Sequence, residues 1–408
     1  MRKLGALLLL LTATAARADD AEEAAVQHFE KLGGKVARTG KAVTALDLRN
    51  TDTTDAHLKE LAALPNLVHL DLCSTRVTDA GLKHVAALGK LTYLDLYETR
   101  VTDAGLKELA ALTKLATLDI GETKVTDDGL KALAPLRSLR ELFISDLDIS
   151  NAGLKNLAPL TGLTTLGVGS TQVTDEGLKE LAAFPKLATL DLTENHITNA
   201  GLKELAKFTT LASLDLGTTN VTDAGFKELA PLTGLKTLYL SYTAVKDGGL
   251  KDLAALPKLT YLDLTKTEVT DAGLKHLGSV TTLTTLNLSY CEVTDAGLKA
   301  LAPLRGLTTL EIPGIKVTDA GLTGLTPLTR LTTLNVSYCD LTDTNLKDVA
   351  ALTRLETLNL RHTRVTDAGL KALAPLTKLT VLDINTTDVT EAAAAEFKKL
   401  RPGCKVIR

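Results

Sequence analysis

The stretch Leu91–Lys114 reads LTYLDLYETRVTDAGLKELAALTK, and the same pattern begins again at Leu115. Steps of 24 residues from Val43 to Leu379 give fifteen starts, with no insertion or deletion between them. A fixed period of this length indicates a repeat architecture, in which each unit packs against its neighbours. We therefore expect one elongated domain, and we count repeat positions from Leu91 as position 1.

The first half of the repeat has the pattern of a strand buried on one face. Leu94 and Leu96 alternate with Tyr93, Asp95 and Tyr97, so the leucines are predicted to point inward and the other three outward. A strand of this kind leaves one row of side chains in every repeat free to contact a partner.

The second half predicts a short helix. We expect Thr102 or Asp103 to accept a hydrogen bond from the first amide groups of a helix over residues 104–112. The helix would close the core with leucines at three-residue spacing, which are Leu106, Leu109 and Leu112. Lys107 lies four residues after Asp103, and we expect the two to pair.

Two small residues recur at fixed positions of the repeat. Position 15, Gly105 in this stretch, is glycine in twelve of the fifteen repeats. Because glycine weakens a helix, its recurrence predicts a close backbone approach between neighbouring repeats. Position 9, here Thr99, is predicted to satisfy backbone groups where the strand ends.

These features resemble the leucine-rich repeat family, across nearly the whole chain. The T-D-x-G-L half is similar to the repeats of F-box-associated and cysteine-containing types, and Asn195 keeps the asparagine common in the wider family. The resemblance implies an α/β fold, a right-handed horseshoe-shaped solenoid similar to ribonuclease inhibitor. Its parallel strands would lie on the concave face and its short helices on the convex face. The chain leaves no room for an F-box, which argues against a ubiquitin-ligase adaptor.

The two ends depart from the repeat. Residues 1–18 combine basic Arg2 and Lys3, a short apolar run and a small-residue end, the layout of a secretory signal peptide. We therefore expect a periplasmic, cell-envelope or extracellular protein without a transmembrane span. Residues 19–42 are predicted to form an N-terminal cap of a helix and a strand, residues 43–402 the fifteen repeats, and residues 403–408 a capping strand.

Composition and motifs favour a non-enzymatic protein. The net charge of −3 and the absence of a long basic run argue against nucleic acid as a partner. The seven scattered histidines indicate no metal site, no catalytic grouping is evident, and we expect no cofactor. We expect no disulfides, because two-repeat spacing places Cys291 and Cys339 about 10 Å apart.

Acidic residues dominate position 5, the outward position between the two strand leucines. Aspartate is a poor strand former, so its recurrence needs a cause. One interpretation is an acidic stripe for a basic partner or a cation, and the other is a solvated residue copied with the repeat. The aspartates are Asp47, Asp71, Asp95, Asp119, Asp191, Asp215, Asp263 and Asp383, joined by Glu311 and by the neutral Asn287, Asn335 and Asn359.

All seven tyrosines of the chain fall at outward strand or strand-end positions. Tyrosine is enriched in protein interfaces, so we interpret them as contact residues, although strands also favour tyrosine. We predict a partner-binding concave face that consists of Tyr93, Asp95, Tyr97, Asp215, Tyr239, Tyr242, Tyr261, Asp263, Tyr290 and Tyr338.

Lysine occupies position 17 in thirteen repeats, from Lys59 to Lys371, on the predicted helices. Two repeats are unusual, one with Phe143 and Leu147 and one with Pro313 at the strand end. Our leading hypothesis is an exported scaffold, expected to be monomeric, that binds a protein or peptide partner, basic if position 5 takes part. The alternative is a structural or adhesive envelope protein that binds polysaccharide or anionic polymer through the lysines.

Overall fold

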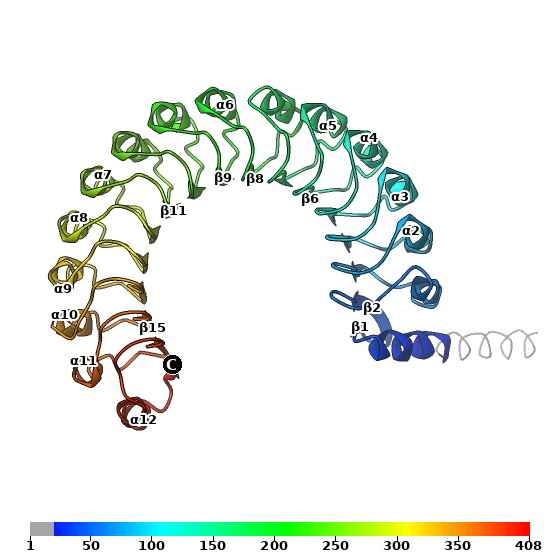
Figure 1. Ribbon diagram of the computed structural model, residues 1–408. Helices are drawn as coiled ribbons and strands as arrows, with labels where there is room; N and C mark the ends of the chain where they lie inside the picture. Colours follow the sequence, from blue (N-terminus) through cyan, green and yellow to red (C-terminus); the bar gives the residue numbers. More distant parts are fainter. Residues whose placement is uncertain (1–19, 345) are drawn as a thin grey trace, which may run out of the picture. The chain divides into compact units, whose positions relative to one another are not determined.

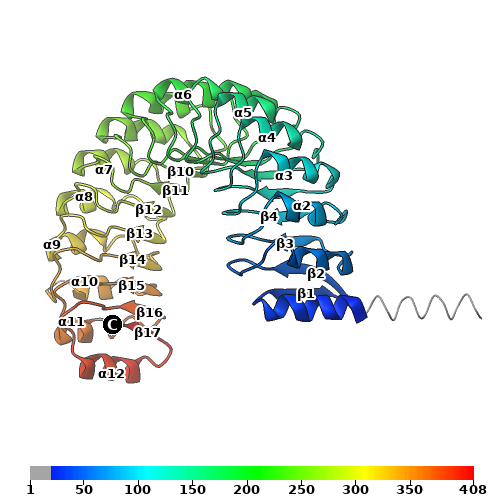
Figure 2. The ribbon, with the colours of Figure 1, turned by 45° about the vertical axis from the view of Figure 1, so that its right-hand side comes forward.

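The computed structural model describes residues 20–344 and 346–408, so the expected signal peptide, residues 1–18, lies outside the described residues. The chain divides into two compact units, Met1–Asp191 and Leu192–Arg408, which are described separately. Within each unit the strands lie along the inner side of an arc and the helices along its outer side (Figures 1 and 2).

Each repeat contributes one short strand, and successive strands pair in parallel without a register shift. In both units the leucines at position 4 are register partners on neighbouring strands, for example Leu94 with Leu118 and Leu238 with Leu262. The first unit contains β1 (Lys35–Thr39), β2 (Ala42–Asp47), β3 (His69–Asp71), β4 (Tyr93–Asp95), β5 (Thr117–Asp119), β6 (Glu141–Phe143), β7 (Thr165–Gly167) and β8 (Thr189–Asp191). The second contains β9 (Ser213–Asp215), β10 (Thr237–Tyr239), β11 (Tyr261–Asp263), β12 (Thr285–Asn287), β13 (Thr309–Glu311), β14 (Thr333–Asn335), β15 (Thr357–Asn359), β16 (Val381–Asp383) and β17 (Lys405–Ile407).

The outer side of each unit carries short α-helices and 3₁₀-helices. The first unit has a helix over residues 20–31, followed by η1 (His57–Ala63), α2 (Asp79–Val85), α3 (Asp103–Glu108), η2 (Leu109–Ala111), α4 (Asp127–Leu130), η3 (Lys131–Leu133), α5 (Asn151–Asn156) and η4 (Gly177–Ala183). The second unit has α6 (Asn199–Leu205), η5 (Asp223–Leu229), η6 (Asp247–Ala255), α7 (Asp271–Leu277), α8 (Asp295–Ala300), α9 (Asp319–Leu322), η7 (Thr323–Leu325), α10 (Leu346–Ala350), α11 (Asp367–Ala372) and α12 (Glu391–Leu400).

The predicted helix over residues 104–112 is present but tighter than expected. It begins at Asp103 as α3 and continues from Leu109 as the 3₁₀-helix η2. A 3₁₀ segment is common at the end of an α-helix, and it narrows the last turn. Leu94, Leu96, Leu106 and Leu109 are fully buried, and Leu112 is 1% exposed, so the predicted core is confirmed.

The first described residues cover one end of this core. The helix over residues 20–31 buries Phe29 completely, and β1 pairs antiparallel with β2. At the other end, β17 adds one more parallel strand to β16. We propose that residues 19–42 and 403–408 are the caps of the repeat array, because β1 lies before the first repeat and β17 after the last, and each adds a strand to one end of the array.

A hydrogen-bond pair between position 13 of one repeat and position 12 of the next recurs along the chain. Asp103 does not cap its own helix: its Oδ1 accepts from the Thr126 amide at 2.7 Å, and its Oδ2 accepts from the Thr126 hydroxyl at 2.8 Å. Helix α3 is capped instead by Thr102, whose hydroxyl accepts from the Ala104 amide. The same two bonds are accepted by the carboxylates of Asp55, Asp79, Asp127, Asp247, Asp271, Asp295, Asp343 and Asp367, among others.

The recurring glycine makes room for this carboxylate. A Cβ atom at Gly105 would lie 2.4 Å from Oδ1 of Asp79 in the preceding repeat and 3.0 Å from Cδ1 of Leu82. The predicted close approach between repeats is therefore real, but its main partner is a side-chain oxygen rather than the backbone. Position 9 behaves as predicted, since the Thr99 hydroxyl donates to the Leu96 carbonyl at 2.7 Å.

Asp103→Ala is expected to lower the free energy of unfolding by about 2 kcal/mol, because it leaves the Thr126 amide and hydroxyl without their acceptor. Asp103→Asn is expected to cost less than about 1 kcal/mol. The chain already uses this exchange at Asn151, whose Oδ1 accepts from the Thr174 amide and whose Nδ2 donates to the Thr174 hydroxyl. Urea denaturation followed by circular dichroism measures both, and equal losses would contradict the assignment.

Gly105→Ala is expected to destabilise the chain by about 1–2 kcal/mol, although alanine is the better helix former by about 1 kcal/mol. The clash with Asp79 and Leu82 outweighs that propensity. Gly89→Ala is the matched control, because a Cβ there meets nothing within 4 Å. Thermal unfolding that ranks the two variants in the opposite order would refute the packing argument.

Candidate interaction surface

The acidic residues at position 5 have a structural role that neither sequence interpretation included. Oδ1 of Asp95 accepts a hydrogen bond from the Tyr97 amide at 2.9 Å, two residues further on, and so closes the end of the strand. An asparagine oxygen does the same, as Asn287 shows with the Ser289 amide at 3.0 Å. The same bond is made by Asp47, Asp71, Asp119, Asp215, Asp263, Asn335, Asn359 and Asp383.

The repeat with Pro313 supports this role. Proline has no amide hydrogen, so the strand end at position 7 has no donor to satisfy. Position 5 of this repeat is Glu311 rather than Asp or Asn. Glu311 therefore has no amide at position 7 to bond.

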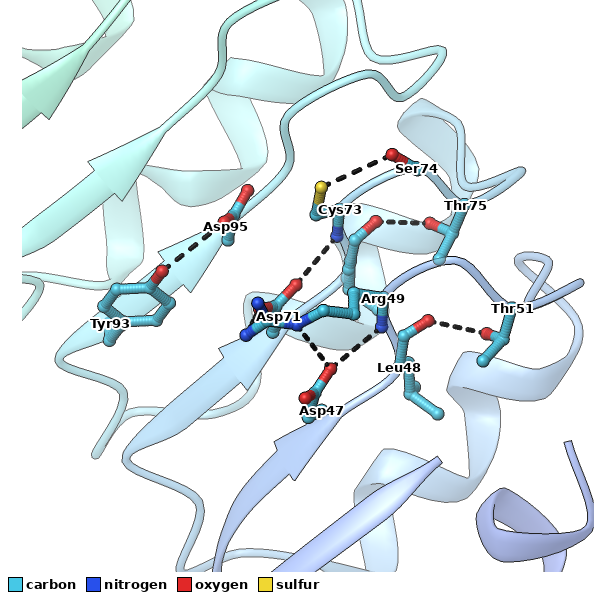
Figure 3. Close-up of polar contacts among 11 residues, drawn as sticks. Asp47, Leu48, Arg49, Thr51, Asp71, Cys73, Ser74, Thr75, Tyr93 and Asp95 are labelled. Atoms are coloured by element: carbon cyan, nitrogen blue, oxygen red, sulfur yellow. Dashed lines mark hydrogen bonds and ion pairs between the residues drawn. The ribbon is translucent and has the colours of Figure 1, made fainter. Parts of the chain in front are cut away.

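In the first unit, an arginine of the chain itself lies on this row of carboxylates (Figure 3). Arg49 Nε lies 3.0 Å from Asp47 Oδ1, and Arg49 Nη2 lies 2.5 Å from Oδ2 of the fully buried Asp71. Asp47 and Asp71 are partners in the neighbouring strands β2 and β3. One guanidinium therefore pairs with the position-5 carboxylates of two strands.

Asp119 stands apart from this ion pair. Burial, with smaller contributions from the carboxylates of Asp95 and Asp71, raises the pKa of Asp119 to about 6. Burial also raises the pKa of Asp71, while the Cys73 amide and the Arg49 guanidinium oppose that rise. The carboxylates thus repel one another where no cation lies between them.

The candidates Tyr93 and Tyr97 are held by neighbouring side chains. The Tyr93 ring stacks on His69 with centroids 4.0 Å apart and planes at 11°, and its hydroxyl lies 3.4 Å from Asp95 Oδ2. The Tyr97 ring covers Gly121, where a Cβ would lie 3.0 Å from ring carbon Cδ2. Burial is the main cause that raises the pKa of each phenol to about 12.

In the second unit, two tyrosines meet on the strand face. The rings of Tyr239 and Tyr261 lie 4.8 Å apart between centroids and are tilted by 48°. Tyr239 is paired in register with Asp215 on one neighbouring strand and with Asp263 on the other. Burial, followed by the Asp263 carboxylate, raises the pKa of Tyr261. Four of the predicted site residues are thus brought together on β9, β10 and β11.

The remaining three tyrosines lie at position 8, just beyond the strands. Tyr242, Tyr290 and Tyr338 have left-handed backbones, with φ of 56°, 57° and 59°, and are 55%, 48% and 46% exposed. Left-handed φ is unfavourable for a bulky residue, yet every repeat adopts it at this position. It places the three rings at the rim of the sheet rather than on the strand face.

Two residues that the sequence interpretation did not include complete this rim. Lys266 Nζ lies 5.0 Å from the Tyr242 centroid and 5.5 Å from the Tyr290 centroid, between the two rings. His362 stacks on Tyr338 with centroids 4.5 Å apart. Both are at position 8, so the same column of the sequence would have revealed them.

The outer side differs from the prediction in its ion pairs. Both carboxylate oxygens of Asp103 accept hydrogen bonds from Thr126, so the main partner of this carboxylate is Thr126 and not Lys107. Lys131 pairs with Asp128, three residues before it, at 2.5 Å. The position-17 lysines are all exposed.

Within residues 20–344 and 346–408, no helix has the length and apolar character to cross a membrane, and no three His, Cys, Asp or Glu side chains are arranged to hold a metal ion. The four cysteines are free thiols, and buried Cys291 donates to the Leu264 carbonyl at 3.0 Å.

Asp119→Asn is expected to stabilise the chain by about 1–2 kcal/mol at pH 7 and much less at pH 4. The folded chain binds the Asp119 proton more tightly than the unfolded chain, so the contribution of this carboxyl to stability falls as pH rises from 3.8 to about 6. Asparagine keeps the acceptor for the Gly121 amide.

Urea denaturation at the two pH values measures the effect. Asp383→Asn is the control, because its neighbours in register are Asn359 and Ile407. A stabilisation of Asp119→Asn that does not depend on pH would show that burial of the charge is not the cause.

Comparisons with known proteins agree with this geometry. A family model described as a leucine-rich repeat region matches residues 69–302, and a second leucine-rich repeat model matches residues 328–350 and 351–374. Among proteins with curated descriptions, none is similar enough to be matched.

Two solved structures have the same fold. A leucine-rich repeat protein of Leptospira interrogans is 21% identical, with a TM-score of 0.60, over 92% of this chain and 94% of that one. An internalin of Listeria monocytogenes is 24% identical, with a TM-score of 0.52, over 88% of this chain and 89% of that one. The chain is a solenoid of parallel strands and short helices, and it belongs to the leucine-rich repeat family.

Proposed function

We propose that the protein is an exported, non-enzymatic scaffold that binds a protein or peptide partner through the strand face and the adjoining rim of its second unit. The observation that carries the proposal is the concentration of tyrosine there. Aromatic residues are only 3% of the chain, yet five of the seven tyrosines lie on β10, β11 and the position-8 rim. Exposed tyrosine provides a large contact area at a low entropic cost, as is common in protein interfaces.

The tyrosines are also held in place before a partner arrives. Tyr239 packs on Tyr261, Lys266 lies between Tyr242 and Tyr290, and Tyr338 stacks on His362. Because these side chains already have few conformations to lose, binding costs less ordering entropy. The strand face is also well suited to an extended or helical partner segment, since it presents one outward row per repeat.

Photocrosslinking in the native host tests the proposal. A crosslinking residue at Thr285 or Thr333 on the strand face is expected to capture a partner, and one at the helix residues Lys203 or Lys299 is not. These positions leave all seven tyrosines intact. Equal capture at both faces, or capture at neither, would contradict binding through the strand face.

The alternative is a structural or adhesive envelope protein. The thirteen position-17 lysines are all exposed on the outer side, which suits an anionic polymer. Retention on isolated cell envelopes that is lost with Lys→Glu changes at these positions, and unchanged by substitutions on the strand face, would favour the alternative over the scaffold.

Export is tested separately. Residues 1–18 fused to a reporter enzyme are expected to direct it out of the cytoplasm, because they have the basic, apolar and small-residue parts of a signal peptide. Arg2 and Lys3 replaced by glutamate provide the control.

A further inference from the structure

We infer that the strand face of the second unit binds an arginine side chain of its partner, with the guanidinium stacked on Tyr239 between the carboxylates of Asp215 and Asp263. This inference rests on the proposed function and names the chemistry that the scaffold recognises.

The first step is the charge on this face. From β9 to β14, all of whose residues the structure describes, the outward positions 3, 5 and 7 hold three acids and no lysine or arginine. The acids are Asp215, Asp263 and Glu311. The nearest basic residues in sequence are Lys236, which precedes β10, and Lys266, which is held between two tyrosine rings. A partner that carries a positive charge therefore complements the face.

The second step is the arrangement of the two carboxylates. Asp215 and Asp263 are in register with Tyr239 on either side, so the three side chains form one row across β9, β10 and β11. The two hydrogen bonds from Thr265, one from its amide and one from its hydroxyl, both fall on Oδ1 of Asp263. The carboxylate can therefore accept a further bond through Oδ2 without losing its role at the strand end.

The third step is a precedent within the same chain. In the first unit, Arg49 already pairs with the position-5 carboxylates of two neighbouring strands, Asp47 and Asp71 (Figure 3). The second unit has the same column of acids, and a tyrosine stands between two of them. Arg49 is at position 7 of its repeat. The repeats that contain β9, β10 and β11 have no cation at this position, where they carry Gly217, Ser241 and Thr265.

The fourth step is the choice of arginine over lysine. A guanidinium is planar, stacks on an aromatic ring and can bond to carboxylates through several N–H groups at once, whereas an ammonium is a compact point charge. Tyr239 is half-buried and its ring packs against Tyr261, so a flat group laid on it meets an ordered surface.

The test uses short peptides and the full chain with ¹³C-labelled tyrosine. A Gly-Gly-Arg-Gly-Gly peptide is expected to shift the ring signals of Tyr239 and Tyr261 and to leave those of Tyr93 and Tyr97 in place. The lysine peptide should bind at least threefold more weakly, and the citrulline peptide, which is neutral, should cause no shift. Equal binding of all three, or shifts confined to other tyrosines, would overturn the inference.

Variants at position 5 distinguish a specific arginine-binding site from general electrostatic attraction of a cationic peptide to an acidic face. Asp215→Asn and Asp263→Asn are each expected to weaken the arginine peptide about fivefold, and Tyr239→Asn about tenfold. Asn287→Asp, one strand beyond Asp263, is expected to strengthen it. All four variants have an Asp or Asn oxygen at position 5 that can close the strand end, so the fold should be retained, as circular dichroism will show.

Asp383→Asn is the matched control, since it removes the same charge from the same column without a neighbouring tyrosine. It should change the affinity less than twofold, and an effect equal to that of Asp263→Asn would overturn the inference. A partner captured at Thr285 whose binding is unaffected by Asp263→Asn and Tyr239→Asn would refute the arginine site while the scaffold function stands. Failure to capture any partner would refute the scaffold function alone, because the peptide titration measures the arginine site directly.

Discussion

The structure depends on one contact that is repeated along both units, the carboxylate or amide at position 13 bonded to the hydroxyl and amide of position 12 in the next repeat. Two hydrogen bonds from a single side chain fix how far one repeat lies from the next and how it is turned. The contact also restricts its surroundings. Because the Asp79 carboxylate fills the space beside Gly105, a Cβ atom at this residue would need a neighbour to shift. The glycine and the aspartate of the repeat are thus two parts of one packing solution.

Much of the fold could be predicted from the sequence, because each position of the repeat occurs fifteen times and its preferred residue type is therefore clear. Periodicity alone predicts that Leu94, Leu96 and Leu106 lie in the core, and all three are fully buried. The prediction for the partner of Asp103 is wrong. Proximity in sequence favoured a contact within its own helix, whereas the bond is made to Thr126, 23 residues away. A pattern shows that a residue recurs, but it does not show which neighbour in space requires it.

The candidate surface was predicted less completely, for two different reasons. The strand-end role of Asp95 follows from local chemistry, and its replacement by asparagine in Asn287, Asn335 and Asn359 was a readable signal that only an oxygen is required. The rim was harder. The contact of Lys266 with Tyr242 and Tyr290 depends on the left-handed backbone at position 8, which no composition or spacing reveals when the residue is not glycine.

The left-handed backbone at position 8 has a consequence for how such a protein can change over generations. Fourteen residues other than glycine adopt it, and they include acids, hydroxyl residues, aromatic rings and a lysine. The strain is therefore imposed by the repeat and is borne by whatever side chain is present. Substitutions at this position alter what the rim displays while the core and the contacts between repeats stay the same. The binding preference of the solenoid can therefore change one repeat at a time by substitution at position 8, without a change in the residues that determine folding.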